Sequence, residues 1–311
     1  MRRWGVWLLL IALTPAGARA EALRLAITNS GIYLSAFVAQ ENGYFAAHGL
    51  DVTIEPVVIT STMPAALMSD SVEIAGPSTP VFLQAVDGGI DLVALAGSAL
   101  ATPDGRNEAL LAPAGSPIHA PADLAGRRVG VPGIGTIMDV MFRHWLASVG
   151  VDQAKVNFVE VGMARVADAL RGGAVDAAVA NDPVLFRILR QKPQPGYVVY
   201  YMQALSGPLP IVLYVTRRDW AAAHRQAVAG FRAATAEGAA YAQAHPDAAR
   251  RIMARYMHVS DAVLADIELP ELAPEVTVDQ LGRMAAMMRA QDMLHGPLVA
   301  PSSALEGLIA P

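Results

Sequence analysis

The fold of this chain is decided by the stretch Val129-Gly130-Val131-Pro132-Gly133-Ile134-Gly135-Thr136-Ile137-Met138-Asp139. Its apolar run breaks at two glycines and restarts with helical spacing, which predicts a strand, a tight loop and a helix N-terminus. Gly133 and Gly135 allow a sharp turn. The first N–H groups of the helix have no partner within it, so such a loop can hold a small polar or anionic group.

The stretch does not match the nucleotide-binding motifs that it superficially resembles. Met138 stands where the third glycine of G-x-G-x-x-G would fall, and the Gly-Lys-Ser/Thr of a P-loop is missing. Taken alone, the pattern fits a purely structural turn as well as a binding loop. The functional interpretation gains weight because the chain repeats the construction.

An internal repeat divides the chain. Its matched residues are Ala66-Leu67, Val72-Glu73, Ala75 and Pro80-Val81 against Ala169-Leu170, Val175-Asp176, Ala178 and Pro183-Val184, at a constant offset of 103. Gly49-Leu50-Asp51 similarly corresponds to Gly150-Val151-Asp152. Because strands alternate with helices in both halves, we expect two equivalent α/β lobes, each a mostly parallel sheet flanked by helices.

Hydrophobic periodicity gives the expected elements. The expected strands are 25–27, 50–55, 72–75, 92–96, 109–112, 129–131, 156–161, 175–179, 197–202 and 209–215. The expected helices include 44–48, 63–68, 81–86, 136–149, 164–170, 220–244, 248–256, 278–291 and 302–308.

The N-terminus has the features of a secretory signal peptide. Two arginines precede an apolar run that is too short for a permanent membrane span, and Ala18-Arg19-Ala20 predicts cleavage after Ala20. The chain has no cysteine. This excludes disulfides, thiolate metal sites and a lipoprotein anchor, so we expect a periplasmic protein.

Composition narrows the classes of function. Removal of Arg2, Arg3 and Arg19 from the 23 basic residues leaves 20 against 28 acidic residues, a formal charge of −8. No cluster of Lys and Arg is present, which argues against a nucleic-acid partner. The seven histidines are scattered without metal-ligand spacing, and no nucleophile motif or cofactor motif stands out. We therefore expect no catalytic residues, no metal and no cofactor.

Open α/β sheets bind ligands beyond the carboxyl ends of their strands. If two such lobes face each other, the equivalent loops line one cleft: Asn29 to Tyr33, Pro77 to Pro80, Pro132 to Thr136 and Ala180 to Pro183. Each helix N-terminus there contributes about 0.3 to 1 kcal/mol toward a bound negative charge. The cleft could then hold a small anion without Lys or Arg.

Several segments resemble one protein family. Gly43-Tyr44-Phe45-Ala46-Ala47-His48-Gly49-Leu50-Asp51-Val52 and Ala122-Asp123-Leu124-Ala125-Gly126-Arg127-Arg128-Val129-Gly130-Val131 are similar to segments of the sulfonate-, taurine- and nitrate-binding proteins of ABC importers, the NMT1/THI5-like family. The resemblance extends over the mature chain. It implies a two-lobed type II periplasmic-binding fold with a two-strand hinge, and delivery of a captured small molecule to a membrane permease.

The resemblance also implies the lobes and the ligand contacts. Lobe I would comprise 21–108 and 208–311, lobe II 109–207, and the hinge would lie near 103–106 and 206–210. The implied contacts are Ser30, Gly31, Tyr33, Ser78, Thr79, Gly135, Thr136, Asn181 and Asp182. We expect a monomer that captures a small organic anion such as a sulfonate or carboxylate, or a nitrate-like ion.

Single residues leave alternatives open. Asp182 either caps the helix after Pro183 or faces an amine, which would favour a zwitterion or a protonated heterocycle. Tyr33 either stacks on a planar ligand or packs at the cleft edge. Arg106 is either a solvated hinge residue or reaches an anion on closure, and Met163 is expected to add apolar surface to the pocket.

Two other functions remain open at this stage. The first is an enzyme of pyrimidine or menaquinone precursor metabolism on the same fold, although the cysteine-rich motif of THI5-type synthases is absent and a signal peptide argues against it. The second is a periplasmic sensor that presents its ligand to a receptor.

Overall fold

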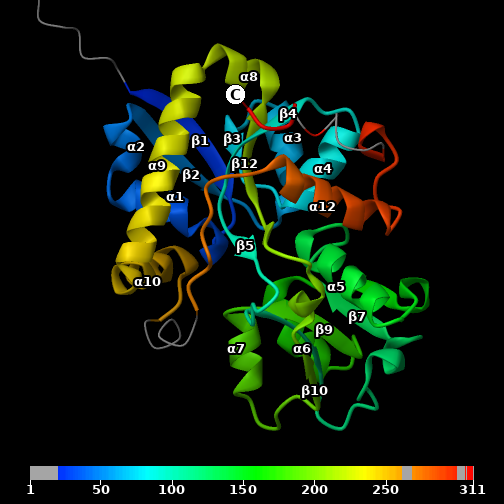
Figure 1. The fold of residues 1–311 in the computed structure, drawn as a ribbon. Coiled ribbons are helices and arrows are strands. Elements are labelled where there is room, and N and C mark those ends of the chain that lie inside the picture. Colours follow the sequence, from blue (N-terminus) through cyan, green and yellow to red (C-terminus); the bar gives the residue numbers. More distant parts are fainter. Residues whose placement is uncertain (1–19, 261–267, 300–304, 306, 311) are drawn as a thin grey trace, which may run out of the picture.

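The computed structural model describes residues 20–260, 268–299, 305 and 307–310. The predicted signal peptide lies outside the described residues except for Ala20, and most of the expected helix 302–308 does too. The strands form two five-stranded sheets and one two-stranded sheet. Helices cover both large sheets, which lie in separate halves of the molecule (Figure 1).

The first sheet has the strand order β2-β1-β3-β12-β4. Its strands are β1 (Glu21–Ile27), β2 (Leu50–Pro56), β3 (Ile74–Ala75), β4 (Leu92–Gly97) and β12 (Leu213–Arg217). Strands β2 and β3 run parallel to β1, whereas β12 is antiparallel to both β3 and β4. One strand in five therefore runs against the others.

The second sheet repeats this plan, with the order β10-β6-β9-β7-β8. Its strands are β6 (Glu108–Ala112), β7 (Arg128–Val131), β8 (Asn157–Glu160), β9 (Ala177–Asn181) and β10 (Tyr197–Val199). Strands β8 and β9 are parallel to β7, and β6 is antiparallel to β9 and β10. Two mostly parallel sheets of equivalent topology confirm the predicted α/β fold.

Eleven helices of the described residues flank these sheets. Those of the first half are α1 (Leu34–Glu41), α2 (Tyr44–Ala47), α3 (Met63–Met68), α4 (Thr79–Asp87), α8 (Arg218–Ala223), α9 (Arg225–Ala244), α10 (Pro246–Met257) and α12 (Val278–Arg289). Those of the second half are α5 (Ile137–Ser148), α6 (Val166–Arg171) and α7 (Val184–Leu189). None of the described helices has the length and apolar character that a membrane span requires.

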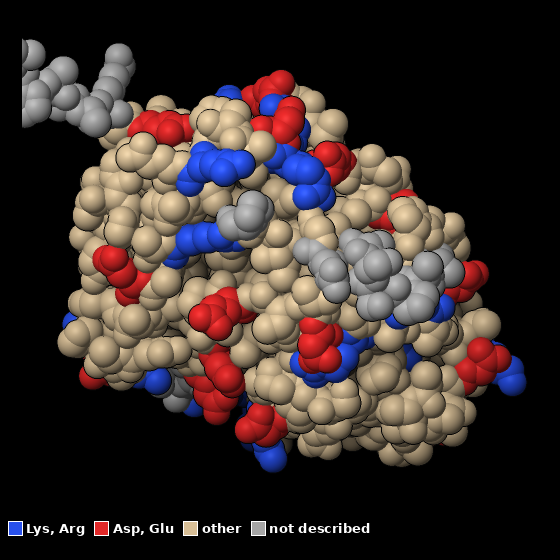
Figure 2. All heavy atoms as spheres, turned by 45° about the horizontal axis from the view of Figure 1, so that its top comes forward, with Lys and Arg blue, Asp and Glu red and all other residues tan. Residues whose placement is uncertain are grey.

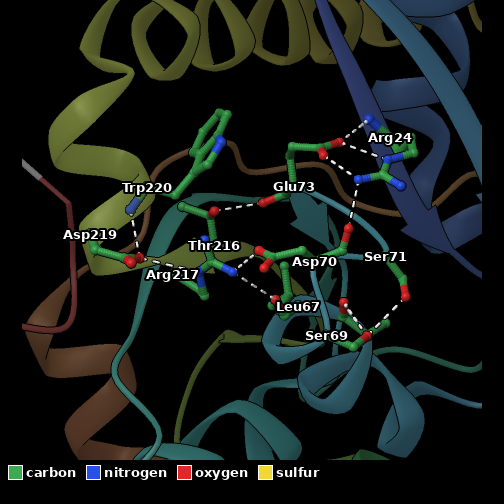
Figure 3. Close-up of polar contacts among 11 residues, drawn as sticks. Arg24, Leu67, Ser69, Asp70, Ser71, Glu73, Thr216, Arg217, Asp219 and Trp220 are labelled. Carbon is green, nitrogen blue, oxygen red and sulfur yellow. Dashed lines mark hydrogen bonds and ion pairs between the residues drawn. The ribbon is translucent and has the colours of Figure 1, made fainter.

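An arginine anchors β1, which lies beside the central strand β3 of the first sheet (Figure 3). The Arg24 backbone N–H and Nε donate to Glu73 Oε2 at 2.7 and 3.2 Å, and Nη2 donates to the Asp70 carbonyl at 2.7 Å. Thr216 Oγ1 of β12 donates to the Glu73 carbonyl at 2.6 Å. These bonds fix the lateral position of β1 next to the segment that leads into β3.

The second sheet has the same anchor. The Arg128 backbone N–H and Nε donate to Asp176 Oδ2 at 2.8 and 3.3 Å, and Nη2 donates to the Gly173 carbonyl at 2.9 Å. Asp176 and Gly173 lie 103 positions after Glu73 and Asp70, which is the offset found in the sequence. The repeat is therefore one of structure, down to individual hydrogen bonds.

Several expected elements end differently. The strand expected over 209–215 is divided into β11 (Leu209–Pro210) and β12, which belong to different sheets. The strand expected over 197–202 stops at Val199, because the next residues form a turn that buries Tyr201. The helix expected over 220–244 is interrupted at His224, where the ring stacks on Trp220 with centroids 4.4 Å apart. The helix expected from Val81 begins earlier, at Thr79, and Ser78 is its N-cap residue.

Substitution of Gly238 tests the contact between α9 and α1. A Cβ atom at Gly238 would lie 2.1 Å from the Ser35 carbonyl oxygen, whereas one at Gly282 of α12 would meet only Leu305 Cδ1 at 3.7 Å. We expect Gly238→Ala to cost about 2 kcal/mol or more through overpacking, which is a fall of about 5 °C in Tm.

The matched control is Gly282→Ala, which should leave Tm unchanged or raise it slightly because alanine favours helix. Thermal unfolding monitored by circular dichroism measures both. Equal effects of the two substitutions would contradict the packing described for α1 and α9.

Candidate ligand-binding site

A cavity of about 680 Å³ lies between the two large sheets. Residues that follow the carboxyl ends of β1, β2 and β3 line one side, and residues that follow β7, β8 and β9 line the other. The first half contributes Asn29, Ser30, Val57, Ile59 and Ser78, and the second Pro132, Thr136, Ile137, Met163, Asn181 and Asp182. This is where open α/β sheets bind ligands.

Five of the nine predicted contacts line this cavity: Ser30, Ser78, Thr136, Asn181 and Asp182. Gly31 lines a smaller hollow of about 40 Å³. That hollow shares Ser30, Glu108, Asn181 and Asp182 with the main cavity. Tyr33, Thr79 and Gly135 belong to neither lining.

Tyr33 and Thr79 require a correction as expected side-chain contacts. The Tyr33 ring is fully buried in the core and its hydroxyl donates to the Gly76 carbonyl, so it neither stacks on a ligand nor lies at the cleft edge. Thr79 is also fully buried, and its Oγ1 donates to the Pro210 carbonyl at 2.6 Å. Both hydroxyls hold the protein together, which the sequence pattern could not distinguish from ligand binding.

The glycine-rich loop is held by carboxylates. Gly135 has a φ of 77°, and its N–H donates at 2.8 Å to Asp139 Oδ2, a fully buried carboxylate that also pairs with Arg143 at 2.7 Å. The Ile134 N–H donates to Glu160 Oε1 at 2.8 Å. The loop is therefore preorganised, and Gly135 contributes its backbone conformation rather than a surface to the cavity.

The N-terminus of α5 opens on the cavity. Its N-cap residue Thr136 makes no capping hydrogen bond, because Oγ1 donates to the Gly133 carbonyl at 2.7 Å. Ile137 and Met138, the first two residues of α5, line the cavity. Their N–H groups lie in the first turn and have no acceptor within the helix.

Ser78 has an unused hydroxyl. It lines the cavity with 1 % of its surface exposed, and within the described residues its Oγ has no hydrogen-bond partner. A buried hydroxyl without a partner costs free energy, so such groups are normally satisfied by water or a ligand. Ser78 is the predicted contact for which the structure provides the most specific reason.

Two carboxyl groups, those of Glu108 and Asp182, line the cavity. Glu108 is 3 % exposed and accepts a hydrogen bond of 2.8 Å from the Tyr201 hydroxyl. Burial raises the pKa of Glu108 to about 7, although the Tyr201 hydroxyl opposes this and the nearby Asp182 adds to it. Burial likewise raises the pKa of Asp182 to about 6.

Asp182 both caps a helix and lines the cavity. Its Oδ1 accepts from the Phe186 N–H at 3.2 Å, so it caps α7, and the same side chain lines the cavity. Its backbone N–H donates to the Asn107 carbonyl at 3.0 Å. The cap interaction fixes the carboxyl group without removing it from the site.

Sequence reasoning missed two charged residues of the lining, Glu108 and Arg187. The four predicted loops lack Lys and Arg, but Arg187 lies on the exposed side of α7, one turn beyond them. Glu108 directly precedes the apolar strand expected over 109–112, and an acidic residue at that place could have indicated a functional side chain. Met163 lines the cavity as expected, whereas Arg106 does not and places its guanidinium 5.5 Å from the centroid of the Tyr200 ring.

The described residues include no group of three or more His, Cys, Asp or Glu side chains that could hold a metal ion. On the face shown in Figure 2, acidic and basic side chains are interspersed.

Solved structures with the same fold include periplasmic binding proteins. The aliphatic sulphonate-binding protein SsuA of Escherichia coli has a TM-score of 0.74 at 19% identity over 93% of this chain and 97% of its own. The alkanesulfonate-binding protein SsuA of Xanthomonas axonopodis pv. citri, bound to MOPS, has a TM-score of 0.72 at 18% identity. The match covers 89% of this chain and 96% of that protein. The nitrate-binding protein NrtA of Synechocystis PCC 6803 has a TM-score of 0.70 at 14% identity. The match covers 92% of this chain and 84% of that protein.

Sequence comparisons point the same way. A Brachyspira hyodysenteriae protein described as an ABC transporter periplasmic binding protein is 37% identical over 65 residues, which are 21% of this chain and 18% of that protein. The family model described as NMT1/THI5 like matches residues 32–249. With most of its length matched and the fold of a periplasmic binding protein, the chain belongs to the NMT1/THI5-like family.

Proposed function

We propose that this protein captures a small organic ligand with an anionic group and delivers it to the permease of an ABC importer. The observation that supports this most directly is the cavity between the two sheets, placed at the carboxyl ends of six strands and lined from both halves. The relatives named as ABC-importer or sulphonate-binding proteins support the class of function.

Three features suit an anionic group. The N-terminus of α5 contributes N–H groups and a partial positive charge. Ser78 offers an unused hydroxyl, and Arg187 contributes a full positive charge to the lining. Such groups suit a sulfonate or a carboxylate.

The remaining lining argues for an organic body on the ligand. Val57, Ile59, Ile137, Met163 and Met257 present apolar side chains to the cavity. Its volume lies in the range of pockets for small organic molecules. A nitrate ion alone would leave most of this space to water, so we favour an organic acid over an inorganic ion.

Binding is proposed to couple to closure of two lobes, 21–108 with 208–311 and 109–207. Strands β5 (Leu100–Ala101) and β11 (Leu209–Pro210) pair in the short sheet next to the expected hinge segments. Glu108, at the proposed boundary, is already part of β6 in the second sheet. A ligand favours closure only through its extra affinity for the closed form.

We further propose that the protein is a monomer in the periplasm, that it is not an enzyme, and that it binds neither nucleic acid nor a cofactor. An enzymatic role and a sensor role are the alternatives.

A thermal-shift screen of residues 21–311, refolded to remove any bound ligand, tests the proposal with sulfonates, carboxylates, nitrate, amines and pyrimidines. Stabilisation by organic acids supports it, whereas stabilisation by none of these compounds contradicts it.

Two adjacent hydroxyls provide a matched pair of variants. Ser78→Ala removes a hydroxyl that has no partner among the described residues, so we expect an unchanged Tm and an affinity about tenfold weaker. Thr79→Ala removes a satisfied buried hydrogen bond outside the cavity lining, so we expect a fall in Tm by a few degrees with unchanged affinity.

Isothermal titration with the acid that gives the largest thermal shift measures both affinities. If Ser78→Ala kept full affinity, its hydroxyl would not be a ligand contact. If Thr79→Ala weakened binding more than Ser78→Ala, the orientation of this loop toward the cavity would be wrong.

A further inference from the structure

We infer that the cavity contains a second subsite, formed by Glu108 and Asp182, that binds a protonated nitrogen of the ligand. The ligand is then a zwitterion with an apolar body rather than a simple anion. This inference rests on the proposed binding function and names the chemical class of the ligand.

Backbone pairing brings the two carboxyl groups to one place. Glu108 is the first residue of β6 and is paired in register with Asn181 of β9. Asp182 follows directly, and its N–H donates to the carbonyl of Asn107. Residues distant in sequence therefore meet at the adjoining ends of two neighbouring strands of one sheet, and both side chains line the cavity.

Both carboxyl groups are held in place. The Tyr201 hydroxyl donates to Glu108 Oε2, and the Phe186 N–H donates to Asp182 Oδ1. Neither carboxyl group forms an ion pair with a described cation. Among the described residues that line the cavity, Arg187 is the single Lys or Arg.

The charge balance favours a cationic group at this end. Glu268 lines the adjoining hollow and its charge raises the pKa of Asp182 further. A further carboxylate from the ligand would add to this repulsion, whereas an ammonium would reduce it and form charge-assisted hydrogen bonds. An anionic group is better placed toward the N-terminus of α5 and Arg187.

Two observations besides the acidic pair point to a bound molecule. The buried Ser78 hydroxyl of the same cavity has no partner within the described residues. The hollow of about 40 Å³ that continues from the pair is lined by Ser30, Gly31 and Asn107 as well. This volume exceeds the space of one water molecule and can accept an ammonium group.

The test compares acids that differ only by an amine. The pairs are phenylalanine against phenylpropionate, γ-aminobutyrate against butyrate, and aminomethylbenzoate against methylbenzoate, each measured by calorimetry at pH 7.5 on residues 21–311. We expect at least one amine-bearing acid to bind tenfold or more tightly than its partner. If the amine-free acids bind equally or better, the inference is overturned and the proposed function stands.

Substitution of the pair should remove this preference. Asp182→Asn and Glu108→Gln keep the size of the side chain and an acceptor for Phe186 or Tyr201. We expect each to weaken the amine-bearing acid about tenfold and to leave the amine-free acid unchanged or slightly tighter. The control is Asp152→Asn, which changes an exposed capping aspartate outside the cavity lining.

If Asp152→Asn and Asp182→Asn had the same effect on binding, the proposed subsite would be contradicted. The same conclusion would follow if Asp182→Asn and Glu108→Gln both kept the preference for the amine-bearing acid. If neither member of any pair and no compound of the wider screen bound, the proposed function would fail, and the inference with it.

The pH dependence supplies a test on the unmodified protein. An ammonium binds the ionised carboxylates, which form as the pH rises through about 6 for Asp182 and about 7 for Glu108. The affinity of the amine-bearing acid should therefore rise about tenfold from pH 5 to pH 8, and that of the amine-free acid should fall.

The neighbouring groups do not reverse this sign. Tyr201 stays neutral because burial and Glu108 raise its pKa well above the ordinary value. The Glu268 carboxylate in the adjoining hollow also favours a cation. A fall in affinity of the amine-bearing acid between pH 5 and pH 8 would contradict the subsite.

Discussion

The structure depends on one constraint, which is that the exposed edges of β3 and β9 must be hydrogen-bonded. In each sheet the strand that satisfies this edge runs antiparallel and comes from outside the repeated unit: β12 pairs with β3, and β6 pairs with β9. The chain therefore has to cross between the two halves more than once. As a result, the strand ends of both sheets face the same cavity, and Glu108 at the start of β6 is part of its lining.

The cavity combines rigid anchors with costly buried groups. Asp139 and Glu160 fix the glycine-rich loop through its N–H groups, and the anchors Arg24 and Arg128 fix β1 and β7. Within the cavity, the Ser78 hydroxyl has no hydrogen-bond partner among the described residues, and Glu108 and Asp182 form no ion pair with a described cation. Polar groups of this kind in a cavity are typical of functional sites, since a ligand can supply the missing partners.

The relatives show why the fold alone does not identify the ligand. Proteins named for sulphonates and for nitrate share this architecture with less than 20% identity to the chain. The framework is common to them, whereas ligand choice depends on the few side chains at the strand ends. In this chain those side chains include two acids and one arginine.

The sequence by itself determined the α/β class, the internal repeat and the position of the loops at the cavity, because periodicity and glycine spacing are local properties. The repeat reappears as matched bonds from Arg24 to Glu73 and from Arg128 to Asp176. Only the tertiary structure decided which loop side chains face the cavity: Ser78 does, whereas Thr79 and Tyr33 turn into the core. It also decided that Glu108 and Asp182 meet, because strand pairing between distant segments leaves no mark in the local pattern.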